Sequence, residues 1–164
     1  MVQTASTTKA IALLLSALFI AQAALGITLP GIGLWRGASL LDRLAYPWLH
    51  NGIIHAACNA WCLLSIVFYY GLTLRRLLLA VLVSATVPPF LLTALPAIGF
   101  SGVLYAILGL MAFDVRRRIY WQTYIWISIL LGLLLPHMAV GIHAYCFAVG
   151  TAIAALNHPF IHRQ

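Results

Sequence analysis

Acidic side chains are almost missing from this sequence of 164 residues, which contains no glutamate and two aspartates, Asp42 and Asp114. Without glutamate there is no HExxH pattern, so a zinc metalloprotease of that type is excluded. Both aspartates fall in expected loops or helix ends, which argues against a paired intramembrane aspartyl centre. A glycine-rich phosphate loop is also missing. We therefore expect no metal and no cofactor.

Charge of either sign is scarce, since 7% of residues are charged and 64% are hydrophobic. A soluble domain has about 25% charged residues, so the solvent of this chain must be lipid. The net charge of +7 could suggest nucleic acid, but the basic residues form short clusters between apolar runs. This pattern indicates membrane topology, with the lipid bilayer and not nucleic acid as partner. The three cysteines, Cys58, Cys62 and Cys146, lie within apolar runs and resemble small buried hydrophobes.

Six apolar segments follow one another along the chain. They cover residues 10–29, 51–70, 77–95, 101–113, 119–135 and 139–156. A spanning helix needs about 20 residues. We therefore predict an all-α membrane protein, a six-transmembrane-helix bundle that forms a single domain over residues 1–164.

Basic residues between these segments predict the orientation of the bundle. With the N-terminus in the cytoplasm, seven basic residues face inward and two, Arg36 and Arg43, face outward. The seven are Lys9, Arg75, Arg76, Arg116, Arg117, Arg118 and Arg163. An even number of helices also places the C-terminus in the cytoplasm. The start of the first segment resembles a cleavable signal peptide, but its apolar stretch continues to Leu29, which favours a retained helix.

The connection over residues 30–46 has two open interpretations, a membrane-embedded hairpin or a simple connector. It contains three glycines and Trp35, and Trp48 follows it. Both tryptophans suit an interfacial position.

Polar residues inside apolar segments are functional candidates, because lipid makes them costly. Four stand out: His55, Asn59, Ser101 and His143. Counted from the cytoplasmic ends of their helices, all four lie at a depth of roughly 17–22 Å. We expect them to share one layer, with His50 just above it at the outer mouth.

The segment that begins at Ser101 is too short to cross a bilayer, so it must start at depth beside a polar cavity. Ser101 is then a candidate nucleophile and His143 its general base. His55 and Asn59, four residues apart on one face, can donate to an oxyanion together with the Ser101 N–H. Tyr105, one turn after Ser101, can pack on the imidazole of His143. Small side chains allow helices to approach closely; they include Gly102, Ala106, Gly109, Gly150 and Ala154.

These motifs resemble the rhomboid family of intramembrane serine proteases. Residues 50–59 match HxxxxHxxxN, residues 99–109 match GxSGxxYAxxG, and His143 with Gly150 resembles the last-helix motif. The resemblance implies a Ser101–His143 dyad, with His55, Asn59 and the Ser101 amide as oxyanion hole and Tyr105 beside His143. It also implies hydrolysis of a peptide bond in or near the transmembrane segment of a substrate membrane protein.

The chain departs from the family pattern at three places. Cys146 and Ile142 are bulkier than the usual residues near the last-helix histidine, which bears on the packing of that helix. The Trp–Arg pair of the first loop has no aligned match, since Trp35–Arg36 lies upstream and Arg43 is displaced. The acidic residue that often follows the second helix is absent.

Two other functions are weighed against the protease. The first is a catalytically inactive rhomboid-like protein that binds transmembrane helices. The second is a small transporter or haem protein that uses the intramembrane histidines. Taken singly, Ser101 is more simply a helix cap, and His143 a packed histidine. Their joint occurrence at one depth favours the protease, which we expect in a bacterial plasma membrane as a multi-pass protein.

Overall fold

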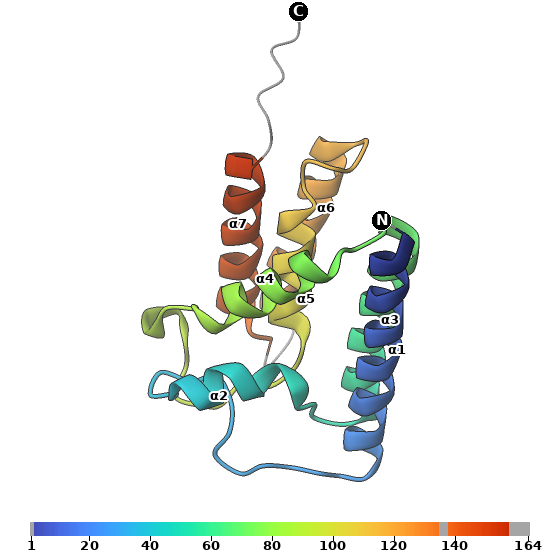
Figure 1. Ribbon diagram of the computed structural model, residues 1–164. Coiled ribbons are helices and arrows are strands. Elements are labelled where there is room, and N and C mark those ends of the chain that lie inside the picture. Colours follow the sequence, from blue (N-terminus) through green and yellow to red (C-terminus); the bar gives the residue numbers. More distant parts are fainter. Residues whose placement is uncertain (1, 135–137, 158–164) are drawn as a thin grey trace, which may run out of the picture.

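The chain folds into helices joined by irregular connections in the computed structural model, which describes residues 2–134 and 138–157 (Figure 1). The longer helices are α1 (Val2–Ala24), α3 (Ile53–Tyr70), α4 (Leu74–Ala85), α5 (Ser101–Leu110), α6 (Arg118–Leu131) and α7 (Val140–Asn157). A short α2 (Leu40–Ala45) precedes a 3-10 turn, η1 (Tyr46–Trp48). Two further 3-10 turns are η2 (Pro89–Leu91) and η3 (Gly132–Leu134). Within the described ranges the structure contains no strand, which confirms the all-helical class.

Three helices, not six, are long and apolar enough to cross a membrane among the residues described. They are Ser6–Ala24 within α1, all of α3 and all of α7. The prediction of six full-length spans is therefore corrected, because α4, α5 and α6 contain 12, 10 and 14 residues. For α4 the cause is local: Pro88 and Pro89 follow its end and cannot continue a helix, so residues 87–95 become irregular chain and η2.

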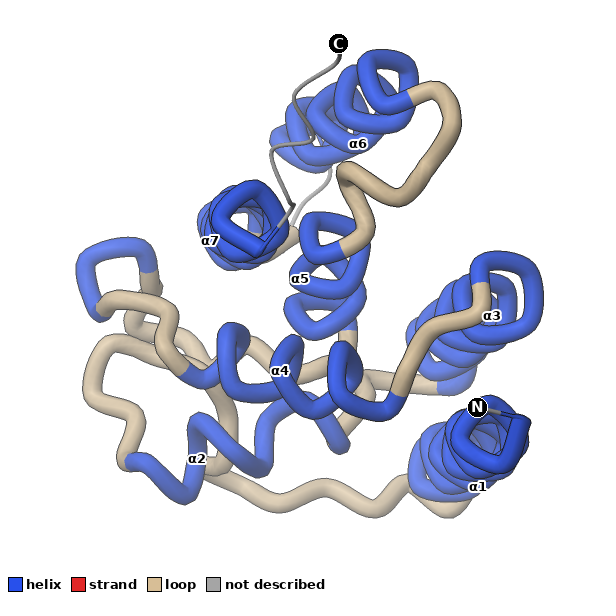
Figure 2. Tube along the Cα trace, turned by 45° about the horizontal axis from the view of Figure 1, so that its top comes forward, coloured by secondary structure: helices blue, strands red, loops and turns tan. Residues whose placement is uncertain are grey.

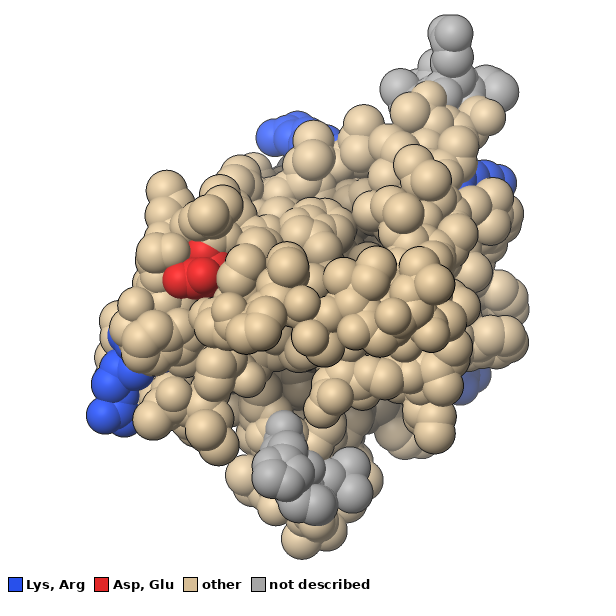
Figure 3. Space-filling view, turned by 90° about the horizontal axis from the view of Figure 1, so that it is seen from below, with Lys and Arg blue, Asp and Glu red and all other residues tan. Residues whose placement is uncertain are grey.

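The start of α1 and the end of α7 lie at the same end of the molecule, and α2 lies at the other (Figure 1). This agrees with an even number of major helices. Which end faces the cytoplasm stays a prediction, and Arg163, counted for that prediction, lies outside the described residues. Seen from the α2 end, the surface is mostly uncharged, with one acidic patch on the face and basic groups near its rim (Figure 3).

Local signals set the helix ends. Ser39 and Asp42 form a reciprocal capping box at the start of α2. Thr73 caps α4 by accepting the backbone N–H of Arg76. The left-handed Gly71, at φ 67°, ends α3 and turns the chain toward α4. These signals place α3 and α4 close together in the chain with a turn of only three residues between them.

Helix α5 lies at the centre, with α3, α4, α6 and α7 around it (Figure 2). Most residues of α5 are buried, including Val103, Ala106 and Ile107. It crosses α7 where Gly109 and Gly150 face one another. A Cβ added to Gly109 would lie 2.8 Å from the Thr151 backbone nitrogen, so the two backbones are in contact. Close approach of small residues is the usual basis of helix association in lipid.

The connection over residues 30–46 contains α2 and is bonded to two other parts of the chain, and whether it is embedded in the membrane stays a prediction. Leu34 and Ala97 exchange backbone hydrogen bonds of 2.8 and 3.0 Å, which attaches this connection to the chain just before α5. Arg43 then donates to the carbonyl oxygens of Val87 at 2.6 Å and Ala85 at 3.1 Å. A cation at the carboxyl end of α4 also complements its helix dipole. The connection therefore holds both ends of the irregular segment that leads to Ser101.

Candidate active site

Ser101 is the first residue of α5, and its hydroxyl meets the imidazole of His143 on α7. The Ser101 Oγ and His143 Nε2 are 2.8 Å apart. His143 is 3% exposed, and Ser101 is partly buried. The two residues are 42 positions apart in sequence, so the close crossing of α5 and α7 brings them together.

The Tyr105 ring lies on the imidazole of His143, with ring centroids 4.4 Å apart and an interplanar angle of 23°. Tyr105 stands one turn after Ser101 on α5. The predicted packing of Tyr105 on His143 is therefore present in the structure. Offset stacking of this kind fixes the plane of the imidazole.

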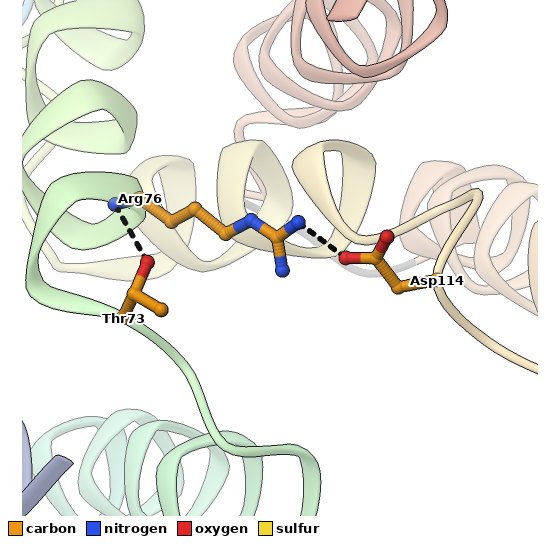
Figure 4. A network of polar contacts seen from close by, with 3 residues as sticks. All are labelled: Thr73, Arg76 and Asp114. Atoms are coloured by element: carbon orange, nitrogen blue, oxygen red, sulfur yellow. Dashed lines mark hydrogen bonds and ion pairs between the residues drawn. The ribbon is translucent and has the colours of Figure 1, made fainter. Parts of the chain in front are cut away.

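His143 has no acidic partner within the part of the chain that the structure describes. Its Nδ1 is buried and makes no hydrogen bond there. Asp114 instead forms an ion pair with the side chain of Arg76, and the backbone N–H of Arg76 donates to the Thr73 hydroxyl (Figure 4). Asp42 is engaged in the capping box of α2. The arrangement is thus a serine–histidine pair without a third residue.

His55 and Asn59 lie on α3 and face the chain that leads into Ser101. A Cβ added to Gly99 would lie 2.7 Å from His55 Nε2 and 3.6 Å from Asn59 Nδ2. Gly99 has φ 125°, which side-chain-bearing residues rarely adopt, so both backbone shape and space require glycine here. All four predicted polar residues therefore converge around residues 99–101.

The hydrogen bonds of His55 and Asn59 leave donors available. His55 Nδ1 accepts the N–H of Asn51 at 3.4 Å, so in the neutral ring the hydrogen resides on Nε2, the nitrogen nearest Gly99. Asn59 is 4% exposed, and its Nδ2 makes no hydrogen bond to any described group. Both groups can therefore donate to a negative charge that develops near Ser101.

His50 packs edge-on against His55 with ring centroids 5.2 Å apart, and its place above the polar layer stays a prediction. Its backbone N–H donates to the Gln22 side-chain oxygen at 2.9 Å, which joins α1 to the start of α3. The pKa of His50 is lowered to about 4, mainly by burial of the ring and to a smaller extent by the nearby His55. The His50 ring is therefore neutral at pH 7, which suits a structural position at the mouth.

Gly102 lies beside Ile142 and Cys146, the two residues of the last helix that depart from the family pattern. A Cβ on Gly102 would lie 2.6 Å from Tyr46 Oη, 3.2 Å from an Ile142 methyl and 3.7 Å from Cys146 Sγ. Ile142 and Cys146 are both buried. Their extra bulk is therefore accommodated because position 102 has no side chain, and the contact between Ser101 and His143 forms beside them.

Tyr46 is a residue of this site that the sequence analysis missed. Its carbonyl oxygen accepts the N–H of Gly99 at 3.0 Å, and its hydroxyl contacts the Ser84 carbonyl oxygen at 3.4 Å. Burial raises the pKa of Tyr46, which keeps the hydroxyl protonated as a donor. Tyr46 thus fixes the chain two residues before Ser101. An aromatic residue before a proline in a connecting segment gives no signal of such a role.

Fold and site together define an integral membrane protein with a buried serine–histidine pair at the start of a short central helix. A family model described as Rhomboid domain matches residues 33–160, most of the chain. The chain therefore belongs to the rhomboid family. Searches of curated proteins and of solved structures gave no match.

Proposed function

We propose that this chain is an intramembrane serine endopeptidase that hydrolyses a peptide bond in or near the transmembrane segment of membrane-protein substrates. The single observation that carries this proposal is the 2.8 Å contact between Ser101 Oγ and His143 Nε2 in a largely buried setting. Membership of the rhomboid family, which includes serine proteases, supports it. The same proposal includes a multi-pass arrangement in a bacterial plasma membrane, with both termini in the cytoplasm.

Acylation would start when His143 Nε2 takes the proton of Ser101 as the oxygen attacks the substrate carbonyl carbon. This requires the tautomer of His143 with its hydrogen on Nδ1. The carbonyl oxygen becomes an oxyanion, and the Ser101 N–H, His55 Nε2–H and Asn59 Nδ2–H are the donors near it. Collapse of the intermediate breaks the C–N bond, and the imidazolium gives its proton to the leaving amine. An acyl ester on Ser101 remains.

Deacylation would use the same groups with water as nucleophile. His143 takes a proton from water as the water oxygen attacks the ester carbon. The bond between that carbon and Ser101 Oγ then breaks, and His143 returns the proton to Oγ. The products are a free carboxylate and the restored dyad. None of these steps needs a metal or cofactor, and among the described residues no cluster of metal-ligating side chains occurs.

Fluorophosphonate labelling of detergent-purified protein tests the proposal. We expect labelling of the wild type and its loss in Ser101→Ala and in His143→Ala, with unchanged melting temperatures. Ser65→Ala, at an exposed position of α3, is the matched control and should label like the wild type. Cleavage of a transmembrane reporter in liposomes, with the product ends read by mass spectrometry, then locates the hydrolysed bond.

Labelling that survives Ser101→Ala would contradict the assignment of the nucleophile. A folded wild type that neither labels nor cleaves would instead favour the inactive, helix-binding alternative. A Soret band or bound metal, together with indifference to Ser101→Ala, would favour the transporter or haem alternative.

A further inference from the structure

Ser128, on α6, is a polar residue inside an apolar helix that the catalytic proposal does not use. Its Oγ lies 3.2 Å from the Tyr105 hydroxyl and donates to the Ile125 carbonyl oxygen at 2.7 Å. A serine hydroxyl has only one hydrogen, and here Ile125 receives it. The Tyr105 hydroxyl must therefore be the donor to Ser128. This gives a directed hydrogen bond from α5 to α6.

Tyr105 links this bond to the dyad. One face of its ring is stacked on the His143 imidazole, and its hydroxyl end is held by Ser128. The imidazole of His143 has a single hydrogen-bond contact among described groups, Ser101 Oγ, because its Nδ1 has none. Where a catalytic triad would orient the imidazole through Nδ1, the described residues supply the stacked Tyr105 ring.

Helix α6 has few other attachments near this point. Only Ile125 and Ile129 of α6 are buried. Their cluster includes Phe147, Tyr105 and Leu108 as neighbours. Trp121 of α6 also donates to the Leu108 carbonyl oxygen of α5, at 3.2 Å. The bond between Tyr105 and Ser128 differs from it because Tyr105 is the residue stacked on His143.

We propose that Ser128 is a positioning residue, which holds the Tyr105 ring against His143. Activation of Ser101 then depends on whether α6 is seated, that is, packed against α5 with the bond between Tyr105 and Ser128 formed. This inference rests on the proposed protease function. When α6 is seated, Tyr105 is fixed at both its hydroxyl and its ring face. When α6 moves away, the hydrogen bond breaks, the ring gains freedom, and His143 is held less firmly.

The test measures the maximal rate of fluorophosphonate inactivation, kinact, and the apparent binding constant, KI. We expect Ser128→Ala to lower kinact by about three- to tenfold, the size expected of one interhelical hydrogen bond, with KI unchanged. Ser128→Thr retains the hydroxyl and should restore most of kinact. Tyr105→Phe removes the same bond from the other side and should lower kinact equally. The double variant Tyr105→Phe/Ser128→Ala should lower it no further.

Thr123→Val is the matched control, since Thr123 is an exposed hydroxyl residue on the same helix. It should leave kinact unchanged. If Ser128→Ala unfolds, Tyr105→Phe decides the matter alone, because it removes the bond without altering α6.

A wild-type kinact in folded Ser128→Ala or Tyr105→Phe would overturn the positioning role and leave the protease proposal intact. A change confined to KI would also overturn it, since that result indicates probe access. Additive losses in the double variant would also overturn it, because the two hydroxyl groups would then act separately and not through one bond. Absence of labelling in the folded wild type would overturn the protease proposal, and this inference with it.

Discussion

Helices α7 and α6 flank the central helix α5 in opposite ways. Helix α7 contacts α5 backbone to backbone, because Gly109 and Gly150 leave no side chain between them. Helix α6 contacts it through side chains, chiefly two buried isoleucines and the hydrogen bonds of Trp121 and Ser128. The pair that must keep a fixed distance, Ser101 and His143, is placed on the first interface. The second interface can open locally at a lower cost in free energy.

The largest expected effect comes from breaking the tight interface with Gly150→Ala. The added Cβ would lie 2.5 Å from the Ala106 carbonyl oxygen, which is backbone and cannot rotate away. Overpacking costs about 1–3 kcal/mol, and the widened crossing should lower fluorophosphonate labelling at least about tenfold. Melting temperature and kinact measure the two effects.

Ala152→Leu is the control for Gly150→Ala, since position 152 is exposed on the same helix. It should change neither stability nor labelling. Wild-type behaviour of Gly150→Ala would mean that the backbone contact does not set the distance between Ser101 and His143.

The second-largest effect is expected at the end of α4, a helix that also packs against α5. Arg43→Met keeps the aliphatic stem but removes the bonds to the Val87 and Ala85 carbonyl oxygens. Two partly buried acceptors then lose a charged donor, which should cost about 1.5–3 kcal/mol of unfolding free energy. Thermal melting in detergent measures this loss. Arg43→Lys retains the positive charge and should recover part of the stability; equal losses in both variants would argue against a role for charge.

A smaller and more local effect is expected when the loose interface is weakened further. Trp121→Phe removes the Nε1 donor to the Leu108 carbonyl oxygen, 3.2 Å away. The loss should be about 0.5–1.5 kcal/mol. Hydrogen exchange of backbone amides should accelerate within α6 and stay unchanged in α5 and α7. Acceleration across all three helices would show that the two interfaces open together.

The smallest effect is expected at the ion pair of Arg76 and Asp114, which joins the start of α4 to the segment that follows α5 (Figure 4). Both side chains are substantially exposed, at 35% and 43%, so Asp114→Asn should cost no more than about 1 kcal/mol. Labelling should not change, because the dyad has no acidic member. A large loss of labelling in Asp114→Asn, absent from Arg76→Gln, would contradict that description.

The sequence predicted the site better than the helix lengths. Ser101, His143, His55 and Asn59 were identified because polar groups at one depth in apolar helices have few explanations other than function. The estimate that these groups share one depth relies only on helix rise and stays a prediction. Assigning α4 as residues 77–95 failed because apolar composition continues past Ala85, whereas the geometry of Pro88 and Pro89 ends the helix.

Contacts made by connecting segments could not be predicted. The role of Tyr46 depends on a carbonyl oxygen, which every residue has, so its identity gives no signal. Arg43 was interpreted as an outward charge that is displaced from the family's Trp–Arg pair, although it bonds two carbonyl oxygens 42 and 44 residues away. Ser128 could have been found by the same rule that found Ser101, since it is a hydroxyl residue within an apolar helix. The packing of Tyr105, by contrast, followed from helical spacing alone.

The split of the dyad between α5 and α7 has a consequence for biosynthesis. Ribosomes make chains from the N-terminus, so Ser101 enters the membrane 42 residues before its proposed base. Until α7 is inserted and docked at Gly109, the serine has no group to take its proton. Under the proposed protease function, a partly synthesised chain would be unable to cleave its own helices or those of its neighbours, and completion of the last helix would switch the activity on.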